Sequence, residues 1–105
     1  MNHLKVNKQI RETVDSRLPG TRILLFGSRS RGDDISGSDY DLLIITPTQL
    51  TFTEKKYWSK TLDEALVKSL AIPVDLLLES EEEVHKKSML PGHVVRTAIR
   101  EGMQL

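Results

Sequence analysis

Residues 22–46 read RILLFGSRSRGDDISGSDYDLLIIT, and the fold is decided in this stretch. After Arg22 the first residues form a short apolar run that ends at Gly27, as a buried strand typically does. A second apolar run covers residues 40–46, and Pro47 ends it because proline cannot donate a hydrogen bond to a neighbouring strand. The sequence therefore predicts two strands joined by a polar, glycine-rich segment.

The segment after the first predicted strand has the composition of a phosphate-binding loop. Gly27 would let a phosphate approach the backbone closely. Free N–H groups at a helix start, together with the Ser28 hydroxyl, could hold phosphate oxygens. Arg29 and Arg31 would add positive charge. The same residues also suit an ordinary turn in which the serine caps a helix, so both interpretations stay open at this point.

Two aspartates open the second predicted strand. Side chains two residues apart lie on the same face of a strand, so Asp39 and Asp41 should point the same way. Two carboxylates this close repel each other, and a hard divalent cation such as Mg²⁺ removes that cost beside substrate phosphates. The alternative is a solvated turn whose acids cap a loop.

Asp75 is a third candidate. It lies between Val74 and three consecutive leucines, in a predicted strand over residues 73–79. A carboxylate among apolar neighbours is costly unless it is paired, hydrogen-bonded or bound to a metal. The alternative is an exposed acid on a half-solvated face of the sheet.

Hydrophobic periodicity predicts the remaining elements. Residues 4–17 carry an apolar residue at every fourth position along one helical face. Residues 53–70 form a longer helix with an apolar stripe, for which Thr53 is the expected N-cap.

The C-terminal part adds two short helices. Ser80 and Glu83 have the spacing of a capping box, Pro91 suits the first turn of a last helix, and Gly102 suits its end. Helices placed between strands predict an α/β (α+β) fold with a small mixed sheet of three or more strands flanked by helices. We expect a single domain over residues 1–105.

The composition excludes several classes of protein. Lys plus Arg and Asp plus Glu number 15 each, so no global positive charge favours direct nucleic-acid binding. The absence of cysteine excludes disulfides and thiolate metal sites. The N-terminus is too polar for a signal peptide, and no apolar run approaches the roughly 20 residues of a membrane span. We therefore expect a cytoplasmic protein without a membrane partner.

The three candidate parts come from three strands whose ends could converge on one cleft. A phosphate loop, paired acids and a third acid match phosphoryl-group chemistry, in which positioning and charge neutralisation do most of the catalytic work. Gly27-Ser28, ten residues, then Asp39-x-Asp41 resembles the GS-x10-DxD signature of the DNA polymerase β-like nucleotidyltransferases. The resemblance extends from residue 23 to about residue 78. The Gly-Ser-Arg-Ser-Arg-Gly segment is most similar to the minimal nucleotidyltransferases (MNT) in this superfamily.

The resemblance implies a nucleotidyltransferase fold and a role for each candidate residue. Gly27 and Ser28 would hold the triphosphate of ATP, while Asp39 and Asp41 would coordinate two Mg²⁺ ions. Asp75 would bind the catalytic Mg²⁺ and help to deprotonate the acceptor hydroxyl. The acceptor would attack the α-phosphate, and pyrophosphate would leave.

The resemblance also implies a partner. Larger relatives carry a further helical domain that binds nucleotide or acceptor, so this chain would need a partner protein or a second subunit to complete its cleft. Minimal nucleotidyltransferases are typically paired with a HEPN-family ribonuclease toxin, and the MNT protein acts as an antitoxin by adding AMP to that toxin. Two alternatives are an antitoxin that neutralises its partner by binding alone, and a small-molecule nucleotidyltransferase.

Overall fold

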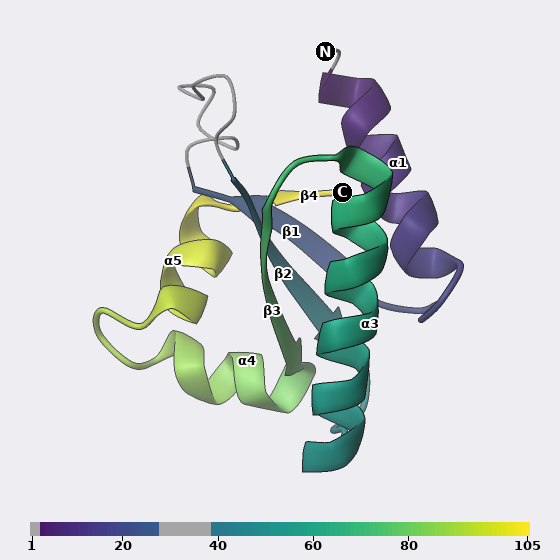
Figure 1. The fold of residues 1–105 in the computed structure, drawn as a ribbon. Helices are drawn as coiled ribbons and strands as arrows, with labels where there is room; N and C mark the ends of the chain where they lie inside the picture. The colour runs from purple at the N-terminus through teal and green to yellow at the C-terminus, as the bar shows by residue number, and fades with distance from the viewer. Residues whose placement is uncertain (1–2, 28–38) are drawn as a thin grey trace.

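The computed structural model describes residues 3–27 and 39–105, which form a mixed sheet with helices on both faces (Figure 1). In chain order the elements are α1 (His3–Asp15), β1 (Arg22–Phe26), β2 (Tyr40–Thr46), α3 (Phe52–Leu70), β3 (Val74–Ser80), α4 (Glu81–Ser88), α5 (Val94–Glu101) and β4 (Met103–Gln104). The α+β class predicted from the sequence is confirmed. Within the described ranges, every helix is too short or too polar to cross a membrane.

The sheet has the strand order β3-β2-β1-β4. β1 runs antiparallel to both of its neighbours, β2 and β4, whereas β2 and β3 are parallel. The parallel pair needs a long crossover, which α3 supplies. The expected mixed sheet of three or more strands is therefore confirmed, and β4 is a strand that hydrophobic periodicity did not predict.

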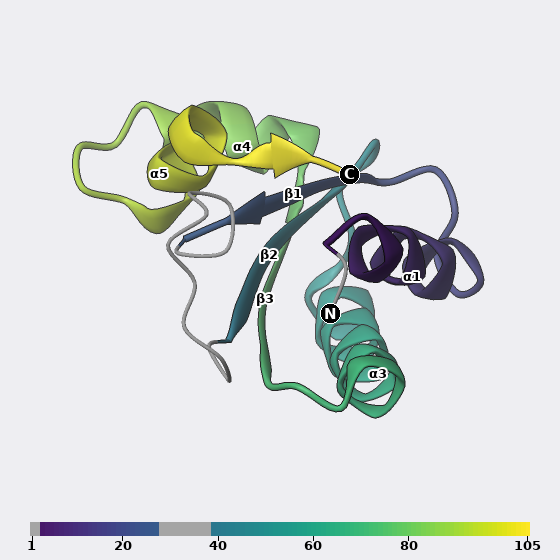
Figure 2. The same ribbon diagram turned by 90° about the horizontal axis from the view of Figure 1, so that it is seen from above.

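Two hydrophobic cores lie on opposite faces of this sheet. Viewed from above, α1 and α3 cover one face, and α4 and α5 cover the other (Figure 2). Side chains alternate between the faces along β2, so that Tyr40, Leu42 and Ile44 join the core under α1 and α3. Leu43 and Ile45 join the core under α4 and α5.

The start of α3 differs from the prediction by two residues. Thr51, not Thr53, is the N-cap, and its hydroxyl accepts a hydrogen bond from the Glu54 N–H at 3.1 Å. The Glu54 carboxylate accepts from the Thr51 N–H at 2.9 Å, which completes a capping box. The residue three positions after each threonine decides which one is the N-cap. Thr51 has the acid Glu54 there, whereas Thr53 would have Lys56, which cannot complete a capping box.

The two C-terminal helices are capped as follows. Ser80 and Glu83 form the predicted capping box of α4. The expectation that Pro91 lies in the first turn of the last helix is wrong, because α5 begins at Val94 and the His93 ring accepts a hydrogen bond from the Val95 N–H at 3.1 Å. Gly102 ends α5 as predicted, but with φ −70° and not in the left-handed conformation.

An ion-pair network fixes the carboxyl end of β3. The buried Glu79 carboxylate contacts the Lys87 ammonium at 2.8 Å and the Lys55 ammonium at 3.1 Å. Lys55 also reaches Glu83 at 2.9 Å. Burial alone would raise the pKa of Glu83, but the Ser80 N–H and the Lys55 ammonium outweigh it and lower the pKa to about 2. The network ties α3 and α4 to the same strand.

Candidate active site

The carboxyl end of β1 lies beside the amino ends of β2 and β3. The strand registers pair Phe26 with Asp41, and Asp41 with Asp75. Cα atoms paired across neighbouring strands lie about 5 Å apart. The structure therefore brings two of the three candidate aspartates into direct adjacency, next to the residue that precedes Gly27.

Asp41 and Asp75 lie on the same face of the sheet. Asp41 alternates with Tyr40 and Leu42, which point to the α1–α3 side, so it shares the α4–α5 side with Leu43. Paired residues on adjacent strands point to the same face, which places Asp75 there as well. Asp39 precedes β2 by one residue and is exposed.

Gly27 is shaped by its contact with Asp41. Its backbone has φ +75°, a conformation that residues with a Cβ rarely adopt. A Cβ built at this position would overlap the Asp41 carboxylate and lie 3.2 Å from its Cγ. The space that a side chain would fill is thus taken by the carboxylate, so Gly27 is required both by conformation and by packing.

The exposure of the acids suits a site that meets a ligand from solvent. Asp75 is exposed and Asp41 is half-buried, although both lie within strands whose other residues are buried or half-buried. Carboxylate oxygens are the donors that Mg²⁺ prefers, and two adjacent ones fit such a cation. No group of three or more His, Asp or Glu side chains in residues 3–27 and 39–105 is already assembled to hold a metal ion.

The other predicted site residues stand as follows. Ser28, Arg29 and Arg31 lie outside the described residues, so their proposed contacts with a triphosphate stay predictions. The roles of Asp39, Asp41 and Asp75 toward Mg²⁺ also stay predictions. Tyr40 is buried on the opposite face, as its position between two acids predicts.

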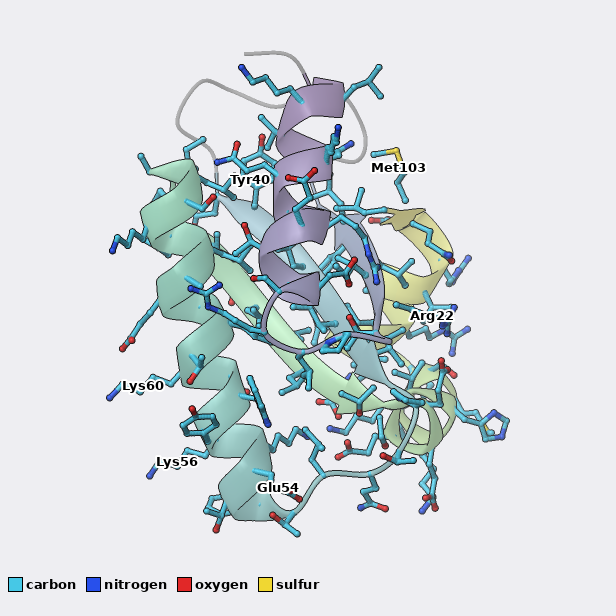
Figure 3. The ribbon with its side chains drawn as sticks, turned by 90° about the vertical axis from the view of Figure 1, so that its right-hand side faces the viewer. Arg22, Tyr40, Glu54, Lys56, Lys60 and Met103 are labelled. Carbon is cyan, nitrogen blue, oxygen red and sulfur yellow. The ribbon has the colours of Figure 1, made fainter. Side chains whose placement is uncertain are left out.

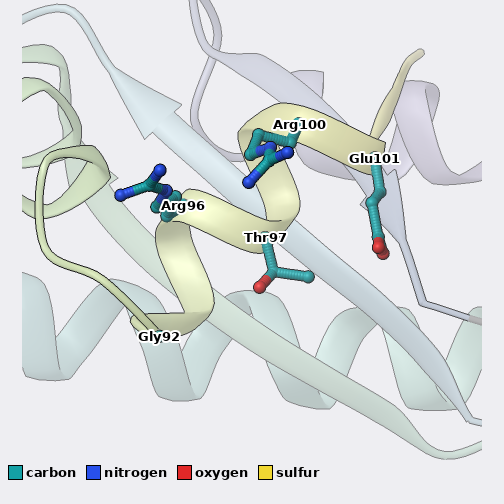
Figure 4. A pocket seen from close by; sticks show the side chains of 5 residues that line it. All are labelled: Gly92, Arg96, Thr97, Arg100 and Glu101. Carbon is teal, nitrogen blue, oxygen red and sulfur yellow. The ribbon is translucent and has the colours of Figure 1, made fainter.

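One feature near this end of the sheet was missed from the sequence. The outer side of α5 carries a hollow lined in part by Arg96 and Arg100 (Figure 4). The sequence signal was the i, i+4 spacing of two arginines, which places them on one side of a helix.

Comparison with known proteins links this geometry to a family. The family described as nucleotidyltransferase domain matches residues 7–101. A relative from Methanocaldococcus jannaschii, provisionally named a protein adenylyltransferase, is 30% identical over 107 residues, which cover 100% of this chain and 99% of the relative.

Solved structures share the fold. One described as a minimal nucleotidyltransferase superposes with a TM-score of 0.68 at 20% identity, covering 100% of this chain and 97% of that one. A toxin–antitoxin crystal structure with AMP-PNP superposes with a TM-score of 0.65 at 22% identity, covering 92% of this chain and 69% of that one. A structure described as a tri-AMPylated Shewanella oneidensis HEPN toxin in complex with an MNT antitoxin superposes with a TM-score of 0.61 at 21% identity, covering 99% of this chain and 71% of that one.

Proposed function

The chain belongs to the nucleotidyltransferase domain family, and we propose that it transfers AMP from ATP to a hydroxyl group of a HEPN-family toxin protein in a Mg²⁺-dependent reaction. That it is a nucleotidyltransferase follows from the family, and its fold is that of a structure described as a minimal nucleotidyltransferase. The observation that carries the proposal further is the adjacency of Asp41 and Asp75 on one face of the sheet, beside Gly27.

The aspartates would divide the work between them. Asp41 and Asp75, with Asp39 next to them, would hold Mg²⁺, which when bound neutralises charge on the triphosphate. The exposed carboxylate of Asp75 is accessible to an acceptor from solvent and would take the proton of its hydroxyl. The acceptor oxygen forms a bond to the α-phosphorus, the bond from that phosphorus to the bridging oxygen breaks, and pyrophosphate leaves.

Gly27 would keep the Asp41 carboxylate in place. Because the carboxylate occupies the space of an absent side chain, it packs directly against the backbone at Gly27. Such positioning matters, since phosphoryl-group transfer depends on geometry and charge more than on covalent chemistry.

The partner is inferred from relatives. The provisional name of the archaeal relative points to a protein acceptor. Similar structures are toxin–antitoxin complexes, and the toxin in one of them carries three AMP groups. A chain with no net charge has no general attraction for nucleic acid, which is consistent with a protein acceptor.

The proposal is tested by incubating the chain with ATP, Mg²⁺ and a HEPN-family protein as the proposed partner, and measuring the partner's intact mass. We expect gains of whole AMP units, which a chelator prevents. Asp41→Asn and Asp75→Asn should each lower the rate by about a hundredfold or more. Asp63→Asn on α3 is the matched control, because it removes a carboxylate without touching the site.

Two outcomes would contradict the proposal. An unmodified partner held in a tight complex by the wild-type chain would favour an antitoxin that acts by binding alone. Modification of a small molecule with no change in the partner's mass would favour the small-molecule class.

A further inference from the structure

A hollow of about 440 Å³ lies along the outer side of α5. It is lined by Gly92, Arg96, Thr97, Arg100 and Glu101. Figure 4 shows the guanidinium groups of Arg96 and Arg100 on one side of the helix, one turn apart. The volume falls within the range of about 300–1,000 Å³ that is typical of small-ligand sites.

The two arginines outnumber the one carboxylate, that of Glu101, among the residues that line the hollow. Neither makes an ion pair or a side-chain hydrogen bond with any residue in 3–27 or 39–105. By contrast, Arg11 pairs with Asp15 at 2.9 Å, and Arg22 pairs with Glu81 at 2.8 Å. Two free guanidinium groups side by side repel each other, and an anion between them removes that repulsion.

The hollow lies on the same face of the sheet as Asp41. The inner side of α5 packs through Val95 and Ala98 onto the core that contains Phe26, the residue before Gly27. The chain leaves α5 into β4, where Met103 pairs with Leu25. The last turn of α5 therefore lies near the end of β1 that carries Gly27, as Figure 2 shows.

We propose that Arg96 and Arg100 hold the phosphodiester of an AMP group already attached to the acceptor, so that the hollow is a subsite for repeated transfer. This rests on the proposed function. Every transfer leaves one negatively charged phosphodiester on the acceptor, and arginine recognises such oxygens with two parallel hydrogen bonds. The hollow has room for the nucleoside as well.

The reaction that this subsite supports is a second nucleotidyl transfer. A ribose hydroxyl of the attached AMP forms a bond to the α-phosphorus of the next ATP, and pyrophosphate leaves. The hydroxyl proton passes to the carboxylate that serves the first transfer. The arginines bind only the product of an earlier round, so they are positioning residues for later rounds.

The first test compares two double variants by the rate of the second AMP addition divided by the rate of the first. Both rates are obtained from the partner's intact mass measured over time. Arg96→Ala/Arg100→Ala should lower this ratio by about tenfold to a hundredfold, the effect of losing charged hydrogen bonds. Lys56→Ala/Lys60→Ala is the matched control, because it removes two cations with the same spacing from α3, which covers the opposite face (Figure 3). The control should leave the ratio unchanged. Arg96→Gln/Arg100→Gln repeats the test with longer side chains.

The outcomes separate this inference from the proposed function. An unchanged ratio in the arginine variants, or an equal fall in both additions, overturns the subsite. A wild-type chain that adds a single AMP also overturns it, while the proposed function stands.

A second test measures binding and does not need transfer. With the transfer site filled by Mg²⁺ and AMP-PNP, AMP is titrated into each variant in a calorimeter. We expect the arginine variant to bind AMP about tenfold more weakly than the control. Equal affinities would refute the subsite even if the wild-type chain transferred nothing, and absence of transfer alone would refute the proposed function.

Discussion

Replacing Gly27 with alanine tests the geometry on which the site depends. Two costs add at this position. The backbone has φ +75°, and holding a residue with a Cβ there costs about 1–2 kcal/mol. The new methyl group would also overlap the Asp41 carboxylate, and overpacking of this kind costs about 1–3 kcal/mol.

The free energy of unfolding, measured by urea denaturation, should therefore fall by about 2–5 kcal/mol in Gly27→Ala. Gly20→Ala is the matched control. Its φ is +85°, but a Cβ there would meet no atom within 4 Å, so only the conformational cost of about 1–2 kcal/mol should appear.

A double-mutant cycle isolates the contact with the carboxylate. In Asp41→Ala the carboxylate is gone, and the nearest remaining contact is the Cβ of residue 41 at 3.5 Å, an ordinary van der Waals distance. The cost of Gly27→Ala should then fall to that of Gly20→Ala, a coupling of about 1–3 kcal/mol. Equal costs for the two glycines in the wild-type background would refute the reasoning. In the transfer assay, Gly27→Ala should lower the rate of AMP transfer by about a hundredfold, because a misplacement of the Asp41 carboxylate by about 1 Å would have that effect.

Two further predictions concern stability. The free energy of unfolding should decline by about 1–2 kcal/mol between pH 4.5 and 2 because of Glu83. The pKa of Glu83 is lower in the folded state than in the unfolded chain, so its carboxylate stabilises the fold above the unfolded pKa and loses this effect as the pH falls, while solvent screens part of the gain. A pH series of urea titrations should show this decline reduced in Glu83→Gln and intact in the surface control Glu82→Gln. Leu62→Ala, at a fully buried position on α3, should cost about 2–5 kcal/mol in urea denaturation, whereas Val67→Ala, at an exposed position on the same helix, should cost about 0.5 kcal/mol or less.

The sequence predicted elements whose causes are local. The face of Tyr40 follows from alternation along a strand, and Tyr40 is buried in the core where alternation places it. The capping box of Ser80 and Glu83 depends on four consecutive residues, and it forms as predicted. The N-cap of α3 was predicted at Thr53. The capping-box rule, which requires an acid three residues after the cap, instead selects Thr51, because Glu54 stands three residues after it.

Features that depend on distant residues were not accessible in this way. β4 has only Met103 and Gln104, too few for a periodic pattern, and it forms because α5 delivers the chain to the open edge of β1. The register that pairs Asp41 with Asp75 is also non-local, because 33 residues separate the first residue of β2 from the first residue of β3. A shift by one residue would have placed Asp75 on the α1–α3 face.

The candidate active site and the α5 hollow are anchored to the same strand. β1 carries Gly27 at its end, and its residue Leu24 lies 3.2 Å from where a Cβ of Gly102 would stand. A side chain at Gly102 would also collide with the Ala98 carbonyl, so glycine is what allows α5 to end this close to β1. The arginines of α5 and the carboxylate of Asp41 are thus positioned by packed helices and strands, which hold groups in a defined geometry more accurately than loops do. A subsite for an attached nucleotide requires this fixed separation, because the next transfer occurs only if the bound AMP presents its hydroxyl to the same carboxylates.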